Sequence, residues 1–302
     1  MIRILRQLAA GAGVLALAAC AVGPNFHRPT LAGPEGYGPA LPADAGAQGL
    51  APGVDLPAQW WEMFHAKALD DLIAQAIHAN PDLDAARAAL RAAHNQVRVQ
   101  QAGLLPTADL NGQASREKDS ETLSPTLNQP LQLFSLYTAQ LAIAYSPDVF
   151  GGVRRSVENA QAQAEQQRFE LEASYLTITS NLANAVILEA GLKAQVDANT
   201  RLVEIARHTL ALDQQEKALG QLAQSDVAAQ AQILAQAEAN LPPLRRQLAQ
   251  ARDLIAALCG KTPSELEIPD VDLDALATPS PLPVSLPSRL VDQRPDIRAA
   301  EA

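Results

Sequence analysis

Side chains that commonly perform chemistry are few in this chain, and they are scattered. The five histidines stand apart without the spacing of metal ligands: His27, His65, His78, His94 and His208. The sequence contains no glycine-rich phosphate loop, no nucleophile elbow and no paired-cysteine metal motif. We therefore expect no enzyme activity, no metal site and no cofactor.

Cys20 is a candidate for covalent modification. Arg3 and Arg6 precede the apolar run Leu8–Leu17, which is too short to span a bilayer as a helix, so residues 1–19 are predicted to be a signal peptide. The run ends in Leu17-Ala18-Ala19-Cys20, which resembles a bacterial lipobox and implies cleavage before Cys20 and its acylation. In such lipoproteins, a residue other than aspartate at the next position, here Ala21, implies delivery to the outer membrane. The alternative is a plain signal peptide beside an unrelated cysteine.

The other cysteine, Cys259, stands near the predicted end of a helix. If Cys20 is acylated, Cys259 has no disulfide partner within the chain. We expect it to be a small buried apolar residue.

Composition favours extended helix packing and argues against nucleic acid as a partner. Aromatic residues make up 4% of the chain, and its formal net charge is -10. Phosphate binding needs a basic face, and no basic stripe is present after the signal peptide.

The segment from Val153 to Leu219 predicts one very long helix. It contains no proline, and Gly191 is its single interior glycine. At roughly 1.5 Å per residue such a helix is about 100 Å long. A compact domain cannot bury it, so partner helices are required.

A heptad pattern indicates where those partners lie. Ten of its twelve positions are apolar, with Glu189 and Asn199 as the exceptions. The positions are Leu171, Tyr175, Ile178, Leu182, Ala185, Glu189, Leu192, Val196, Asn199, Val203, Ala206 and Leu210. A second stripe comprises Leu188, Leu202, Ile205 and Leu212. Two stripes favour a wall of helices, but an ordinary long coiled coil is an equally open interpretation.

Shorter helices are expected on both sides of this segment. Apolar spacing predicts helices over 68–79 and from about 82 to 104, with Asn80-Pro81-Asp82 between them. A returning helix from about 227 to 259 should be capped by Asp226 or Ser225, and should kink or restart at Pro242-Pro243. The aromatic patch Trp60–Phe64 is expected to anchor an extended tether to the folded body.

Two runs of alternating residues predict a β-hairpin, over 107–115 and 136–146. One face would carry Ala108, Leu110, Ala114, Tyr137, Leu141, Ile143 and Tyr145. Each run has the length of a membrane strand, about 9–11 residues, and the polar residues 116–134 between them indicate a surface loop. A soluble hairpin is the alternative. Two strands are not stable alone, so strands from elsewhere are required.

The end of the sequence resembles an earlier part. Residues 294–302 (RPDIRAAEA) match residues 80–88 (NPDLDAARA) at five of nine positions, and Ile297 stands for Leu83. We expect 294–302 to begin a second, truncated copy of one structural unit.

Several short motifs, in this order, resemble the TolC-like outer-membrane factors, specifically the NodT-type lipoproteins of resistance-nodulation-division efflux pumps. The resemblance covers the whole chain. It rests on Cys20 with Gly23-Pro24 and Arg28-Pro29, Trp60-Trp61 with Phe64, Asn80-Pro81-Asp82-Leu83, Leu104-Leu105-Pro106, 145–151, Gly220 with Asp226-Val227, Leu258-Cys259-Gly260, and Leu286-Pro287 with Arg294-Pro295-Asp296-Ile297.

This resemblance implies a mainly α fold, in which a long α-helical hairpin of tunnel type and two transmembrane β-strands form one of two repeats of an outer-membrane efflux duct. It implies a homotrimer with a shared 12-stranded barrel in outer-membrane lipid, passive export of small molecules or drugs, and docking on a periplasmic adaptor (membrane fusion) protein and an inner-membrane pump. The adaptor-contact tip would comprise Leu219, Gly220, Gln221, Leu222, Ala223 and Ser225. The spacing of the tip's turn taken alone favours an ordinary connection between two helices.

Departures from the family pattern limit what can be carried over. Ser146-Pro147 and Gly152 replace the usual residues at the junction between strand and helix, so the second strand should end by Pro147. The gating residues belong to the second repeat and cannot be assigned. A lipid-anchored periplasmic coiled-coil scaffold without a pore is the alternative function.

The expected domain organisation follows from these segments. The signal peptide (1–19) and the lipidated tether (20–65) precede the first helices (66–105) and the transmembrane hairpin with its extracellular loop (106–150). The long periplasmic helical hairpin (151–260), an inter-repeat linker (261–293) and the start of the second repeat (294–302) complete the chain.

Overall fold

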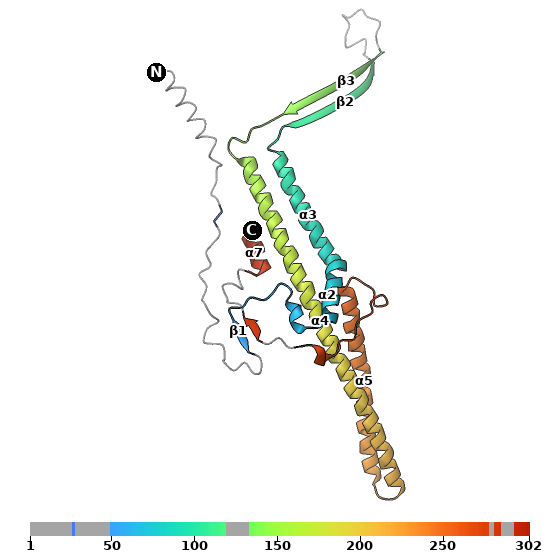
Figure 1. The fold of residues 1–302 in the computed structure, drawn as a ribbon. Helices are drawn as coiled ribbons and strands as arrows, with labels where there is room; N and C mark the ends of the chain where they lie inside the picture. Colours follow the sequence, from blue (N-terminus) through green and yellow to red (C-terminus); the bar gives the residue numbers. More distant parts are fainter. Residues whose placement is uncertain (1–25, 28–48, 119–132, 278–280, 285–292) are drawn as a thin grey trace, which may run out of the picture. The chain divides into compact units, whose positions relative to one another are not determined.

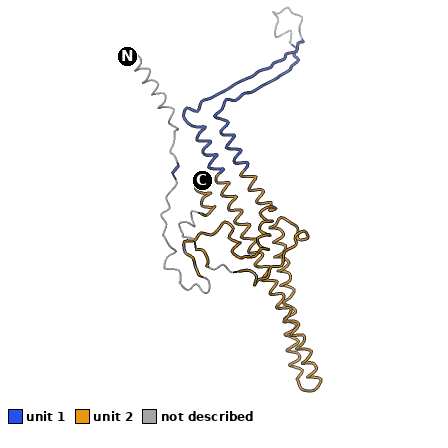
Figure 2. Tube along the Cα trace, viewed as in Figure 1, with its two compact units in different colours: residues 1–27, 91–164 blue, residues 28–90, 165–302 orange. Residues whose placement is uncertain are grey.

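The computed structural model describes residues 26–27, 49–118, 133–277, 281–284 and 293–302 (Figure 1). Contacts divide these residues into two units (Figure 2). The first comprises residues 26–27 and 91–164, and the second comprises the described residues of 49–90 and 165–302. Helices α3 (Pro81–Ala102) and α4 (Gly152–Ala218) contribute to both units. The fold is mainly helical with one long β-hairpin, as predicted.

Helix α4 confirms the long helix expected from the sequence, because it is one uninterrupted element of 67 residues (Figure 1). Gly191 lies within it, and a Cβ at that position would meet nothing within 4 Å. The helix stops just before Gly220, whose φ of 74° is the left-handed conformation that glycine adopts without strain.

The heptad stripe of α4 is the side that packs within the second unit. Seven of its positions are buried: Ile178, Leu182, Ala185, Glu189, Leu192, Val203 and Ala206. The second stripe is exposed, with Leu188 at 53% and Ile205 at 63%. One of the two apolar faces therefore has its partners within this chain, and the other faces outward.

Helix α5 (Gln224–Leu258) returns antiparallel to α4 and is linked to it by polar side chains (Figure 1). Asn199 donates from Nδ2 to the carbonyl oxygen of Ala237 at 2.9 Å. Arg207 pairs with Glu238 at 2.7 Å. These contacts fix which turn of one helix lies against which turn of the other.

Pro242 and Pro243 lie inside α5 without ending it. Of the two outcomes expected there, a kink or a restart, the restart does not occur, since the helix is continuous from Gln224 to Leu258. Each proline removes one backbone donor, and the bonds on either side maintain the helix.

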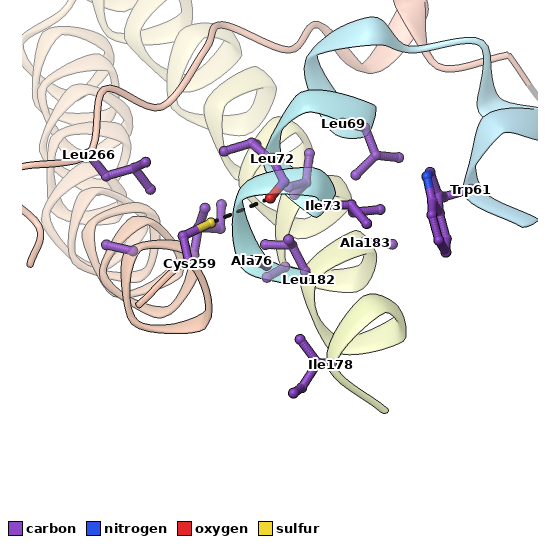
Figure 3. Close-up of a cluster of buried hydrophobic side chains, with 14 of the residues drawn as sticks. Trp61, Leu69, Leu72, Ile73, Ala76, Ile178, Leu182, Ala183, Cys259 and Leu266 are labelled. Atoms are coloured by element: carbon purple, nitrogen blue, oxygen red, sulfur yellow. Dashed lines mark hydrogen bonds between the residues drawn. The ribbon is translucent and has the colours of Figure 1, made fainter. Parts of the chain in front are cut away.

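The main core lies in the second unit, where α2 (Lys67–Ala79) meets α4 and the end of α5. Figure 3 shows side chains from these segments pointing toward one another. The core includes Leu69, Leu72, Ile73 and Ala76 of α2, Ile178, Leu182, Ala183, Ala185 and Val186 of α4, and Ile255, Ala256 and Cys259 at the end of α5. Apolar spacing along α2 and α4 brings these residues to facing sides.

The aromatic patch forms a 3-10 helix, η1 (Trp60–Phe64), that is attached to this core. Trp61 is 4% exposed, and its ring lies 6.1 Å from that of Tyr175 on α4. Trp60 packs edge-on against both Trp61 and Phe64. This confirms the predicted anchor, whereas most of the tether lies outside the described residues.

The turn between α2 and α3 is locked to the end of α5. Buried Asn80 accepts a hydrogen bond from the N–H of Asp82 at 2.8 Å and donates to the carbonyl oxygen of Leu258 at 2.9 Å. Gly260 packs so closely that a Cβ there would overlap the carbonyl group of Ala79. Two motifs far apart in the sequence, at 80–83 and 258–260, therefore contact each other, and we call this contact the joint at Asn80.

Short elements of the second unit complete the fold. Strand β1 (Leu50–Pro52) pairs in parallel with β4 (Leu282–Val284), a contact that the irregular sequence around both did not predict. The 3-10 helix η2 (Leu273–Ala275) precedes β4, and α7 (Pro295–Glu301) is the last helix. Lys193 of α4 pairs with Asp270 and Asp272, which holds the segment after α5 against α4.

The first unit contains the β-hairpin and the helix ends that adjoin it. Strands β2 (Thr107–Lys118) and β3 (Leu133–Ala144) are antiparallel, with Thr107 opposite Ala144 and Lys118 opposite Leu133. The predicted loop 116–134 is too long at both ends, because residues 116–118 belong to β2 and residues 133–134 belong to β3. The rest of the loop lies outside the described residues. Strand β3 ends before Pro147, as expected.

Candidate functional site

The predicted apolar strand residues lie directly opposite one another across the hairpin. Ala108 pairs with Ile143, Leu110 with Leu141, and Ala114 with Tyr137. Directly opposed residues share a face of a sheet, so this register gathers the six residues on one side. We call this set, with Tyr145 just beyond the end of β3, the strand face.

The strand face is strongly exposed in the isolated chain. Leu110 and Tyr137 are each 78% exposed, Ile143 is 69% exposed and Leu141 is 63% exposed. Water is an unfavourable environment for a continuous apolar band of this kind, at about 25 cal/mol for each Å² of apolar surface. The band therefore needs an apolar environment or partner.

The opposite side of the hairpin is more polar. Asn111 lies opposite Gln140, and Gln113 opposite Thr138, although Leu136 and Ala142 of β3 lie on the same side. The central part of the hairpin therefore has one apolar and one largely polar face, which is the alternation found in strands that separate lipid from water.

Asp148 caps the start of α4, a role that the sequence analysis did not assign. Its Oδ2 accepts a hydrogen bond from the N–H of Arg154 at 2.9 Å. The residue just before the helix, Gly151, has no side chain that could do this. An aspartate shortly before a predicted helix start was the available signal.

The hairpin tip between α4 and α5 is a compact turn. Gln221 donates its N–H to the carbonyl oxygen of Glu216 at 2.9 Å, and Gly220 donates to that of Lys217 at 2.9 Å. This pair of bonds is a Schellman motif, which satisfies the last carbonyls of the helix. The side chain of Lys217 also contacts Gln224 across the turn. The tip is therefore held in one shape.

The structure presents the predicted tip residues on the surface. Leu219 is 73% exposed, and Gly220, Gln221, Ala223 and Ser225 are exposed, while Leu222 is partly buried. An exposed leucine on an ordered turn can bind an apolar pocket of another protein.

The predicted cap of the returning helix needs a correction. The N-cap position is Ala223, and neither Asp226 nor Ser225 occupies it. Asp226 lies in the first turn instead, and its Oδ2 accepts a hydrogen bond from the N–H of Ala223 at 3.3 Å. The Schellman turn is shorter than the sequence pattern indicated, so the helix begins at Gln224.

Of the two cysteines, only Cys259 is among the described residues, and it is buried as predicted. It is fully buried at the end of α5, and its Sγ lies 3.8 Å from the carbonyl oxygen of Leu72 (Figure 3). Burial raises the pKa of this thiol, which keeps it protonated. Cys20 lies outside the described residues.

Two further kinds of site have no candidates within the described ranges. No three His, Cys, Asp or Glu residues in these ranges are grouped so that they could hold a metal ion. No helix in the same ranges is long and apolar enough to cross a membrane.

Comparison with known proteins identifies the family. The sequence profile described as outer membrane efflux protein matches residues 72–261. This chain belongs to the outer membrane efflux protein family. The match extends from the second half of α2 to the residue after Gly260, so it includes the hairpin, the tip and the joint at Asn80.

Curated members of the family resemble most of the chain. The pyoverdine export outer membrane protein OpmQ of Pseudomonas aeruginosa is 30% identical over 247 residues, which are 81% of this chain and 52% of OpmQ. The toluene efflux pump outer membrane protein TtgF of Pseudomonas putida is 30% identical over 296 residues, or 95% of this chain and 60% of TtgF. The chain thus spans about half to three fifths of these relatives' length.

Solved structures of the family confirm the predicted fold. The outer-membrane channel OprN superposes with a TM-score of 0.77 at 27% identity, covering 93% of this chain and 61% of OprN. CusC superposes with a TM-score of 0.73 at 20% identity, covering 93% of this chain and 60% of CusC. The expected likeness to the TolC-like outer-membrane factors is therefore correct.

Proposed function

We propose that this chain forms part of the outer-membrane channel of an efflux pump, and that the channel is a passive exit duct for small molecules. The register of the hairpin carries the proposal, because it places Leu110 opposite Leu141 on an exposed apolar face. Family membership supports the same function, since relatives are named for the export of pyoverdine and of toluene.

The strand face would contact outer-membrane lipid, and the polar face would line the water-filled side. Two strands leave open edges, which lipid does not tolerate, so closure requires strands from other chains or from a second repeat. We propose a homotrimer, which the resemblance to the TolC-like outer-membrane factors implies, with residues 106–150 as the transmembrane hairpin and residues 294–302 as the start of a second repeat.

The hairpin of α4 and α5 would extend into the periplasm and end at the adaptor. In this arrangement the ordered tip, with Leu219 at its surface, contacts a periplasmic adaptor protein that connects it to an inner-membrane pump. The exposed second stripe of α4, with Leu188 and Leu202, would pack against helices of neighbouring subunits. Acylation of Cys20 would add a lipid anchor.

Ion conductance distinguishes this function from that of a lipid-anchored scaffold. The purified protein, reconstituted into planar bilayers, should produce discrete conductance steps, one each time a complete barrel inserts. A matched variant with arginine on the strand face, Leu110→Arg, should insert less often. A protein that binds membranes stably but never conducts would contradict the channel and favour the scaffold.

A further inference from the structure

The two similar helix starts differ on one helix face only. Residues 80–88 and 294–302 differ in charge or polarity at three aligned pairs, Asn80 and Arg294, Asp84 and Arg298, and Arg87 and Glu301. Positions 80, 84 and 87 are spaced i, i+4 and i+7, so they lie on one side of a helix. The two charged pairs are inverted in sign between the copies.

The backbone of the two starts is otherwise alike. Asn80 has φ −72° and ψ 122°, and Arg294 has φ −67° and ψ 122°. Each is followed by a proline at the first position of its helix, α3 and α7 respectively. The difference in side-chain charge therefore falls on two nearly superimposable helix starts.

The inverted face has a different contact in each copy. In the first, Asp84 pairs with Arg87 at 3.0 Å, and Arg87 donates to the carbonyl oxygen of Ile77 at 3.0 Å, which joins α3 to α2. In the second, the guanidinium of Arg298 lies over the ring of Phe169 on α4, 4.5 Å from its centroid.

Phe169 is suited to receive such a cation. It is 3% exposed, yet it does not belong to the main core cluster of the described residues. The face of an aromatic ring carries negative charge density, so it attracts a guanidinium and repels a carboxylate. Arg168 lies farther from the same ring, at 5.8 Å, and is paired with Glu172.

We propose that the ring of Phe169 is a selective binding site for the helix start at 294–302, and we call its contact with Arg298 the seat. The sign of the charge at position 298 excludes the similar start at 80–88. The aligned residue of that start is Asp84, which would place a carboxylate against the ring. One position thereby keeps two similar segments of the chain in different places. This inference is independent of channel activity.

Exchange of the hydrogen-bonded amides of α7, those of residues 298–302, tests the seat in the 302-residue chain. Arg298→Asp should raise the local opening constant roughly 3- to 30-fold, the range expected for loss of a cation–π contact. Arg298→Gln should raise it less, and Arg298→Lys should stay near wild type. Arg168→Ala is the matched control, and protection at Ala251 and Ile255 reports that the variants remain folded.

A double-mutant cycle separates the seat from a general effect on α7. In a Phe169→Leu background, Arg298→Asp should have a much smaller effect, because the ring is gone. An equal effect in both backgrounds would overturn the proposal. So would wild-type exchange in Arg298→Asp itself.

Converting one helix start into the other tests the selectivity. The converted chain carries Arg294→Asn, Ile297→Leu, Arg298→Asp and Glu301→Arg. It should lose protection of α7, and restoring Arg298 alone should recover most of it. Recovery from restoring Glu301 alone, but not Arg298, would overturn the assignment to this position.

Discussion

The buried carboxylate of Glu189 on α4 accepts a hydrogen bond from Nε of Arg252 on α5 at 2.8 Å. Glu189 is one of the two polar residues in the apolar heptad stripe, and the other, Asn199, also contacts α5. Polar groups inside an apolar seam are satisfied only in one alignment of the helices. These two exceptions therefore specify the register of the long hairpin.

Removing Arg252 should destabilise the chain more than removing Glu189 does. Arg252→Met leaves a buried carboxylate without a partner and should cost about 1–3 kcal/mol of unfolding free energy. Glu189→Met removes the acceptor and leaves only a half-exposed guanidinium without this partner, so it should cost less. Urea unfolding followed by circular dichroism measures both. The exposed pair of Arg207 and Glu238 is the control, and its loss should cost less than about 1 kcal/mol. A larger cost for the control pair would contradict the proposed role of Glu189.

Two glycines should respond in opposite directions to substitution by alanine. Gly260→Ala places a Cβ against the carbonyl of Ala79 at a φ of 66°, so it should destabilise by about 2 kcal/mol or more. Gly191→Ala faces open space inside α4 and should stabilise by about 0.5–1 kcal/mol. The shift in thermal midpoint measures both, and an unchanged or raised midpoint in Gly260→Ala would contradict the packing at Gly260.

The start of α4 should loosen when Asp148 loses its side-chain acceptor. Asp148→Ala removes the oxygen that accepts the hydrogen bond from the N–H of Arg154, and loss of such a cap costs about 0.5–2 kcal/mol. Amide exchange of residues 149–157, corrected for intrinsic rates, should therefore show more opening in this variant. Asp148→Asn keeps an oxygen that can accept the same hydrogen bond, so it is the matched control and should stay closer to wild type. Unchanged exchange in Asp148→Ala would mean that the cap does not hold the helix.

A charge at Leu219 should weaken the proposed binding of the tip to an adaptor without lowering the free energy of unfolding. Leu219→Asp puts a charge on an exposed leucine, so it should weaken crosslinking to a co-expressed adaptor by tenfold or more, roughly the loss of one buried apolar anchor. Gln232→Asp, also exposed but farther along α5, is the matched control. Equal crosslinking by both variants would place the adaptor contact elsewhere.

Periodic features of the fold were predictable from the sequence, and contacts between distant segments were not. The heptad of α4 and the alternation of β2 and β3 repeat over many residues, so their signals accumulate. The partners of Asn80, Gly260 and Arg298 are 178, 181 and 129 residues away in the chain, and no local pattern indicates them. The strand face was found because cross-strand pairing follows from alternation, whereas the cap by Asp148 depends on the loop geometry.

The position of the strand-face side chains in a membrane distinguishes a membrane-spanning hairpin from one that lies in water. Leu141→Cys and Gln140→Cys, each in a Cys259→Ala background, place a fluorophore on the apolar and the polar face of the same strand. Signal from Cys20 is removed by subtracting the parent protein. In vesicles, the label at position 141 should be quenched by nitroxides in the acyl chains, and the label at position 140 by a water-soluble quencher. Equal access of the water-soluble quencher to both positions would contradict a membrane-spanning hairpin.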